Sequence, residues 1–265
     1  MGIREPAVAG QFYPGNSEAL KRMLASFFSK KRKQAIAREA IVPHAGYIYS
    51  GAIAAESFVK LKASKTFVIL CPNHTGLGSE IAVSTSKRWA TPLGHIEVDT
   101  ELAEEIVASG SASFDELAHI GEHSAEVQVP FIQYLFKNAK ILPITVGTDN
   151  FEVLLRFAES LVKASKKNHF SLIASSDFSH FVPLKYAKEK DMKAIEFIKK
   201  LDVEGFYNYV LEQRLSICGY APITVTLHYC RKKGRKKAVL LKYDTSAKVT
   251  KDKANVVGYA SIIFV

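Results

Sequence analysis

Three short apolar segments, each followed by a polar loop with a histidine, constrain the fold of this chain more than any other feature. The segments span residues 41–42, 66–71 and 170–174, and the histidines that follow them are His44, His74 and His180. Apolar, β-branched runs between turn residues are typical of buried strands. In open α/β sheets, the loops that follow such strands form the functional crevice. We therefore predict that three strands direct their histidines into one crevice.

The remainder of the chain alternates further strands with helical segments, and no internal repeat or long linker interrupts it. This alternation is typical of α/β layers. We predict one domain over residues 1–265, with a mostly parallel or mixed central sheet flanked by helices. Ser50 is expected to cap the helix after the first strand. Glu122 is expected to open a helix that continues to Leu135.

Charge and composition exclude several classes of protein. The 36 basic and 26 acidic residues give a net charge of +10, with basic clusters at residues 30–33 and 231–237. Neither cluster alternates with aromatic residues, so we interpret them as solvated surface and expect no nucleic-acid partner. No segment approaches the roughly 20 apolar residues of a membrane span, and residues 1–15 lack the order of a signal peptide. We expect a cytoplasmic protein that does not bind membranes.

The three cysteines are too few for a disulfide framework in a chain of this length. Cys71 ends an apolar strand and Cys230 lies on an amphipathic helix, so both are expected to be small buried side chains. Cys218 differs because it lies in a loop, next to a glycine and just before a helix. We therefore regard Cys218 as a candidate functional residue.

His44, His74 and Cys218 form a plausible set of metal ligands. Two neutral imidazoles and a thiolate suit a transition metal, and three protein ligands leave coordination positions open for substrate or water. The glycines at 46, 76 and 219 would let a ligand approach the backbone closely. The alternative is that each histidine is a hydrogen-bonded structural residue.

Two further pairs are candidates for proton transfer or for lining the crevice. Asp177 and His180 lie three residues apart after the third strand, where a carboxylate could orient an imidazole that acts as acid or base. His123 and Glu126 have the spacing of one helix face and could reach the same cleft. Asp177 could instead only form a turn, and Glu126 could complete a capping box. The remaining histidines have no such context and are interpreted as structural: His95, His119, His169 and His228.

Six blocks of this sequence, in this order, resemble the Memo family, and the resemblance covers essentially the whole chain. The blocks are Arg4–Pro14, Pro43–Tyr47, Pro72–His74, Gly121–Glu126, Ser176–His180 and Cys218–Gly219. The resemblance implies a fold similar to that of the class III extradiol ring-cleavage dioxygenases, which hold non-haem iron. It places His44 and His74 on the two histidine ligands and His180 on the acid/base position. Cys218 stands where those dioxygenases have a glutamate.

The cysteine has chemical consequences for the metal. A thiolate is a softer ligand than a carboxylate and is itself oxidisable. The resemblance implies a metal-dependent redox protein with non-haem iron or copper, with zinc less favoured. It also suggests AMMECR-type and radical-enzyme proteins as pathway partners in prokaryotes. The sequence indicates no particular oligomeric state.

We derive three functional hypotheses. The first is a metalloprotein with a redox or dioxygenase-like site for an unknown small substrate, for which an aromatic compound is one candidate. In it, His44, His74 and Cys218 hold the metal, His180 moves protons under the influence of Asp177, and residues 123 and 126 line the cleft. The second is a non-catalytic module that captures an acidic peptide or small anion. The third is a zinc hydrolase, because two histidines and a cysteine also suit zinc with an activated water.

Overall fold

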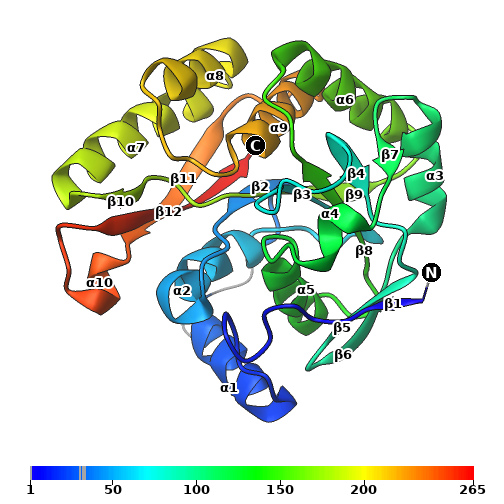
Figure 1. The fold of residues 1–265 in the computed structure, drawn as a ribbon, viewed down its shortest axis with the longest axis horizontal. Helices are drawn as coiled ribbons and strands as arrows, with labels where there is room; N and C mark the ends of the chain where they lie inside the picture. Colours follow the sequence, from blue (N-terminus) through cyan, green and yellow to red (C-terminus); the bar gives the residue numbers. More distant parts are fainter. Residues whose placement is uncertain (1, 30, 32–33) are drawn as a thin grey trace.

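A mixed β-sheet with helices on both faces organises the chain (Figure 1). The structure is a computed structural model that describes residues 2–29, 31 and 34–265. The strand order of the main sheet is β10-β12-β2-β9-β3-β8-β4-β7, and β11 pairs with β12. A separate small sheet has the order β1-β5-β6. The predicted α/β class with a mixed central sheet is confirmed.

The strands of the described residues are β1 (Ile3–Arg4), β2 (Glu39–Val42), β3 (Thr66–Pro72), β4 (Ile81–Val83), β5 (Arg88–Thr91), β6 (Gly94–Glu97), β7 (Ser113–Phe114), β8 (Lys140–Val146), β9 (Phe170–Ser175), β10 (His180–Val182), β11 (Ala238–Thr245) and β12 (Val256–Phe264). The helices are α1 (Ser17–Phe28), α2 (Tyr47–Phe58), α3 (Thr100–Ala108), α4 (Leu117–Ile120), α5 (Val129–Leu135), α6 (Phe151–Ala164), α7 (Leu184–Lys199), α8 (Val203–Glu212), α9 (Tyr220–Lys232) and α10 (Ala247–Thr250). A 3-10 turn, η1 (Glu126–Gln128), precedes α5.

The centre of the sheet is parallel, and it contains the three strands predicted from the sequence. β9 pairs in parallel with β2 on one side and with β3 on the other, and β3 pairs in parallel with β8. All residues of β2, β3 and β9 are buried, as expected for parallel strands covered on both faces. The carboxyl ends of the three strands therefore lie at the same edge of the sheet.

Helices cover both faces of this sheet. Figure 1 shows α6 and α9 on one side and α1, α2 and α5 on the other. The two cysteines expected to be buried, Cys71 at the end of β3 and Cys230 in α9, have no exposed surface. This packing makes the sheet a rigid support for the loops at its carboxyl edge.

Two predicted helix starts were wrong. Helix α2 begins at Tyr47 rather than after Ser50, and the Ser50 hydroxyl donates a hydrogen bond to the Ala45 carbonyl from within the helix. Residues 121–125 are not helical, and the Ser124 N–H donates to the Glu122 carboxylate instead of to a backbone carbonyl. The 3-10 turn begins at Glu126, and α5 follows with Pro130 in its first turn, where proline lacks only an unused donor.

One basic cluster lies mostly outside the described part of the chain. Residues 30, 32 and 33 are not described, whereas Lys31 forms an ion pair with Glu56. Within the described ranges, no helix combines the length and the apolar character needed to cross a bilayer.

Candidate metal centre

The loops after β2 and β3 bring two of the predicted ligands together, and a third ligand approaches from outside the sheet. The rings of His44 and His74 are 5.3 Å apart, centroid to centroid. The Cys218 sulfur lies 3.2 Å from His44 Nε2. Ligand atoms of all three residues lie within 4.8 Å of one another. Residues separated by up to 174 positions thus form one compact set of nitrogen and sulfur donors.

Tight packing next to Gly219 holds Cys218 against the sheet edge. A Cβ atom at Gly219 would lie 2.4 Å from the Ser176 Cβ and 2.6 Å from the Ser175 carbonyl oxygen, so only glycine fits there. The Gly219 N–H donates to the Ser176 hydroxyl, and the Asp177 N–H points at the Cys218 sulfur at 3.3 Å. This glycine was expected to admit a ligand, but the space is filled by the protein itself.

Hydrogen bonds fix the tautomer of His44. The Ser175 hydroxyl gives its proton to the Ser124 carbonyl and accepts an N–H from Gln128. His44 Nδ1, 3.0 Å from the same hydroxyl, must therefore be the protonated nitrogen. His44 Nε2 keeps its lone pair and faces Cys218. Burial, followed by the nearby His123 and His74, lowers the pKa of His44 well below its ordinary value, so the ring is neutral.

A buried carboxylate orients His74 in the same way. Glu122 Oε1 lies 2.9 Å from His74 Nδ1, and Oε2 accepts the His74 backbone N–H at 2.6 Å. The Ser124 N–H and hydroxyl also donate to Oε1. Burial alone would raise the pKa of Glu122, but the hydrogen bonds from His74 and Ser124 lower it to about 2. Glu122 is therefore ionised, His74 Nδ1 is the donor, and Nε2 is free to bind.

Carboxylate–histidine pairs of this kind typically set the basicity and orientation of a metal ligand. We expect Glu122→Gln to weaken metal affinity about 10- to 100-fold, because the neutral amide cannot fix His74 equally well. Competition with a chelator of known affinity measures the change. Glu159→Gln is the matched control, since Glu159 forms the same kind of pair with His228 in α9. Equal affinities in the two variants would contradict the orienting role of Glu122.

His123 joins the cluster, as expected. Its ring lies 4.7 Å from that of His74 and 5.4 Å from that of His44, centroid to centroid. On its other side it packs against Phe12 of the N-terminal arm, at 4.7 Å. Burial lowers the pKa of His123, which favours the neutral ring. Three imidazoles therefore line one wall of the crevice, and burial favours the neutral form of two of them, His44 and His123.

Glu126 does not line the crevice with His123, and the corresponding prediction was wrong. Its fully buried carboxylate accepts hydrogen bonds from Arg4 Nη1 at 2.7 Å and from the Tyr13 hydroxyl at 2.6 Å. It also accepts the backbone N–H groups of Ala7 and Val8. All of these donors belong to residues 4–13, so Glu126 fastens the N-terminal arm. The capping-box alternative is also excluded, because the side chain does not turn back to its own helix.

Asp177 and His180 lie close to the cluster and interact electrostatically with each other, but their hydrogen bonds go to other residues. Asp177 Oδ1 accepts the His44 backbone N–H at 2.8 Å. Burial raises the pKa of Asp177 to about 6. His180 is oriented instead by Ser216, whose carbonyl lies 2.7 Å from Nδ1 and whose hydroxyl accepts the His180 backbone N–H. Because a carbonyl only accepts, Nδ1 is protonated and Nε2 is the free nitrogen of His180.

Comparison with known proteins identifies the family. The family model described as Memo-like protein matches residues 4–263. A MEMO1 family protein of Methanosarcina barkeri is 45% identical and covers 98% of this chain and 99% of its own length. A MEMO1 family protein of Aquifex aeolicus is 40% identical over the full length of both chains. This chain belongs to the Memo family. The predicted resemblance is confirmed.

A solved structure shares the fold of this Memo-family chain at low sequence identity. An uncharacterized protein from Escherichia coli K12 superimposes with a TM-score of 0.59 and 10% identity. The match covers 86% of this chain and all of the bacterial one. At this identity the likeness concerns the fold alone, and it supports the α/β architecture.

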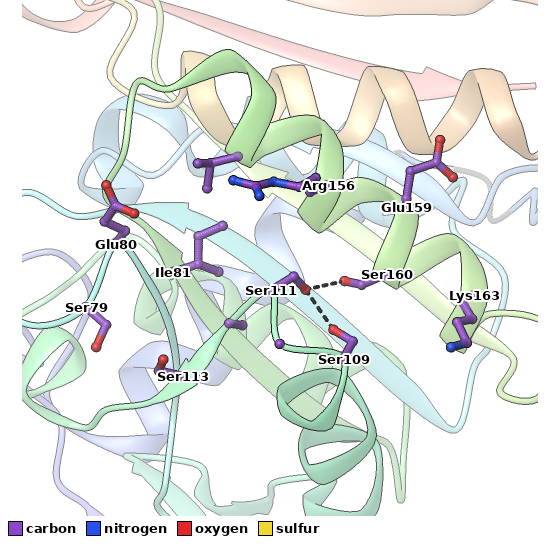
Figure 2. A pocket seen from close by; sticks show the side chains of 13 residues that line it. Ser79, Glu80, Ile81, Ser109, Ser111, Ser113, Arg156, Glu159, Ser160 and Lys163 are labelled. Atoms are coloured by element: carbon purple, nitrogen blue, oxygen red, sulfur yellow. Dashed lines mark hydrogen bonds between the residues drawn. The ribbon is translucent and has the colours of Figure 1, made fainter.

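A separate cavity of about 720 Å³ contains none of the cluster residues. It lies between α6 and the loop at 109–113, and Figure 2 shows Arg156 and several serines around it. The hydroxyl of Ser111 bonds to those of Ser109 and Ser160, so these serines satisfy one another. We therefore base the functional argument on the histidine and cysteine cluster rather than on this cavity.

His119 lies outside the cluster, and its burial predicts that the stability of this Memo-family protein depends on pH. It has no exposed surface, and its Nε2 lies 3.0 Å from the Ala82 carbonyl. Burial lowers the pKa of His119 from 6.5 to about 4, although Glu116 opposes the shift. Between pH 6.5 and pH 4, His119 is therefore protonated in the unfolded chain but stays neutral in the folded protein. Stability falls as the pH drops from 6.5 toward 4.

The free energy of unfolding of the wild type should fall between pH 7 and pH 4.5. For His119→Gln we expect this fall to be smaller by roughly 2–3 kcal/mol. Glutamine can keep a donor near the Ala82 carbonyl but does not titrate. Urea unfolding at the two pH values measures the difference. Identical losses in the two proteins would show that His119 is not the group responsible.

Sequence reasoning missed the residues that orient the ligands. Glu122 stands beside His123 within the Gly121–Glu126 block, but it was predicted only to open a helix and not to orient a ligand. Ser175 and Ser216 gave no signal, because a serine at a strand end or in a loop is common. The adjacent acidic residue at 122 was the one usable clue, since metal-binding histidines typically donate to a carboxylate.

Proposed function

We propose that this Memo-family chain is a metalloprotein that holds iron or copper at His44, His74 and Cys218 for a redox or dioxygenase-like reaction. The orientation of the imidazoles carries the proposal. Nδ1 of His44 and Nδ1 of His74 are both occupied by hydrogen bonds within the protein. In the neutral rings the lone pair then lies on Nε2, which in His44 is 3.2 Å from the Cys218 sulfur, as in histidines that bind metals.

The donor set fits a transition metal in number, type and spacing. Metal–nitrogen and metal–sulfur bonds of tetrahedral sites place such donors about 3.6 Å apart. The 3.2 Å between His44 Nε2 and the Cys218 sulfur, and the 4.8 Å limit for the whole set, require only small adjustments. A mixed imidazole and thiolate set suits copper, iron and zinc better than magnesium or calcium.

A bound iron or copper ion would supply one-electron chemistry or dioxygen activation. The chain's own side chains would supply proton transfer, positioning of the ligands and exclusion of water. His180 Nε2 is placed to take or give a proton, because Ser216 holds Nδ1. The Asp177 carboxylate fixes the His44 loop by accepting the backbone N–H of His44. Phe12 covers one face of His123 and keeps water from that side of the cluster.

Metal analysis of protein purified without an affinity tag tests the proposal. We expect near-stoichiometric iron or copper, either as isolated or after anaerobic reconstitution, and oxygen uptake in the presence of a reductant. Failure of the protein to bind either metal would overturn the proposal and favour the non-catalytic binding module. Zinc occupancy together with inertness to oxygen would favour a hydrolase instead.

A further inference from the structure

Helix α7 carries a carboxylate, Asp191, on the side that it turns toward the core. The other buried residues of this helix are small or apolar: Ala187, Ala194, Ile195 and Ile198. Asp191 lies on the same helical stripe and has no exposed surface. Burying a carboxylate is costly, and packing alone would favour an apolar residue at this position. The presence of an aspartate therefore indicates a role other than filling the core.

Ser179 and Tyr243 supply the hydrogen bonds of this carboxylate. The backbone N–H and the hydroxyl of Ser179 donate to Asp191 Oδ1, at 3.1 Å and 2.6 Å. The Tyr243 hydroxyl, from β11, donates to Oδ2 at 2.6 Å. Burial raises the pKa of Asp191, whereas these hydrogen bonds and the charge of the nearby His180 lower it. The carboxylate thus connects α7 to the residue that directly precedes His180.

Strand β12 holds Ser179 from the other side. The Gly258 N–H donates to the Ser179 carbonyl, and the Gly258 carbonyl accepts the Phe178 N–H, both at 2.8 Å. A Cβ atom at Gly258 would lie 2.2 Å from Asp191 Oδ2, so a larger residue there would displace the carboxylate. Ser179 is therefore bound through its N–H, its hydroxyl and its carbonyl.

The backbone that follows Ser179 needs this support. Phe181, whose side chain is exposed, has a φ of +55°, in the left-handed region that bulky residues avoid. The pairing of β10 with β12 also shifts register between His180 and Val182. Such strained backbone persists only where the surrounding contacts over-determine it. The two bonds from His180 to Ser216 likewise require the His180 backbone to stay in place.

We propose that Asp191 is a positioning residue for His180. By holding Ser179, the carboxylate keeps the His180 ring where the Ser216 carbonyl fixes its proton on Nδ1 and leaves Nε2 free. The inference rests on the proposed function for the role of His180 in proton transfer, and it adds a residue that acts on His180 from the core. Without the carboxylate, the Ser179 turn can relax, and the His180 ring then loses its bond to Ser216.

The tautomer of His180 measures the position of its ring. Long-range proton–nitrogen correlation spectra of metal-free protein with isotope-labelled histidine distinguish protonation on Nδ1 from protonation on Nε2, at a pH where the ring is neutral. His180→Gln assigns the signal. We expect Nδ1–H in the wild type, and in Asp191→Ala a ratio of Nδ1–H to Nε2–H that is roughly 3- to 10-fold lower, as for the loss of one hydrogen bond. An unchanged ratio in folded Asp191→Ala would overturn the inference.

Two further variants separate positioning from stability. Tyr243→Phe removes a donor from the same carboxylate but leaves both bonds from Ser179. Its melting temperature should therefore fall by roughly 2–10 °C while the His180 tautomer stays that of the wild type. Asp191→Asn should restore the wild-type tautomer, because the amide oxygen can still accept both bonds from Ser179. An equal shift of the tautomer in Tyr243→Phe, or no rescue by asparagine, would contradict the positioning role.

Ser179→Ala decides the question if Asp191→Ala does not fold. It removes the hydroxyl donor but keeps the backbone N–H, so the tautomer ratio should shift in the same direction by roughly 2-fold. A wild-type ratio in Ser179→Ala would then overturn the inference.

The spectra also separate this inference from the proposed function, because they are recorded without metal. A His180 tautomer that depends on Asp191, in a protein that takes up no iron or copper, would support the positioning role and contradict the proposed metal centre. Stoichiometric metal in the wild type, together with a His180 tautomer that does not respond to Asp191→Ala, would support the metal centre and overturn the positioning role.

Discussion

Replacing His74 by alanine is expected to abolish stoichiometric metal binding while the protein stays folded. His74 supplies one of three proposed ligand atoms, and two remaining donors cannot complete the site. Its side chain is about one-third exposed, and the backbone N–H of residue 74 and Ser124 still donate to the buried Glu122 carboxylate, so the protein should stay folded. Elemental analysis after anaerobic loading with iron or copper measures the stoichiometry, and circular dichroism checks the fold. His44→Ala should have the same effect on metal content.

His228→Ala provides the matched control for this loss. His228 is also an imidazole paired with a carboxylate, through Nε2 and Glu159 at 2.8 Å, but it lies in α9 outside the cluster. We expect this variant to take up metal like the wild type. Full metal occupancy in both His44→Ala and His74→Ala would refute the ligand assignment.

Arg4→Ala is expected to be the most destabilising of the substitutions considered, at about 3–5 kcal/mol. The Arg4 and Glu126 side chains are 3% and 0% exposed, and the guanidinium also donates to the His119 and Glu122 carbonyls. Its Cζ atom lies over the Trp89 ring, 4.1 Å from the ring centroid. Removing it leaves the Glu126 carboxylate buried beside fewer donors, which is costlier than losing an exposed pair.

The expected fall in melting temperature is about 6–20 °C. Arg88→Ala serves as control, because Arg88 pairs with Glu97 at a similar distance but with both side chains about half exposed. Such surface pairs contribute about 0–1 kcal/mol. A double variant of Arg4→Ala and Glu126→Gln should recover part of the loss by removing the unpaired charge. Equal stability of the Arg4 and Arg88 variants would contradict the importance of the buried pair.

The position of the crevice followed from local sequence patterns. Apolar runs before His44, His74 and His180 indicated strands whose loops meet, and β2, β3 and β9 do lie next to one another with their carboxyl ends at one edge. Such patterns are readable because a parallel strand is buried on both faces and so must be apolar throughout. The same reasoning placed Cys218 in a loop before a helix, where α9 begins two residues later.

The partners of the polar side chains could not be read in this way. Asp177 is three residues from His180, yet it holds the His44 backbone, while Ser216 orients His180. Glu126 is three residues from His123, yet it holds Arg4, a residue 122 positions away. Sequence spacing predicts contacts only within one regular helix or strand, whereas Asp177 lies in the loop before β10 and His123 in the loop before the 3-10 turn that Glu126 begins.

The sequence by itself determined the α/β class, the edge of the sheet that carries the cluster and which residues are its candidate nitrogen and sulfur donors. These depend on apolar periodicity and on residue type, which are local properties. The tertiary structure alone decided which nitrogen of each imidazole is free, because a tautomer is set by an acceptor such as Glu122 or Ser175 that folding brings to it. It also decided that the strained residue of β10 is an exposed phenylalanine beside His180, since a backbone angle results from strand pairing rather than from residue type.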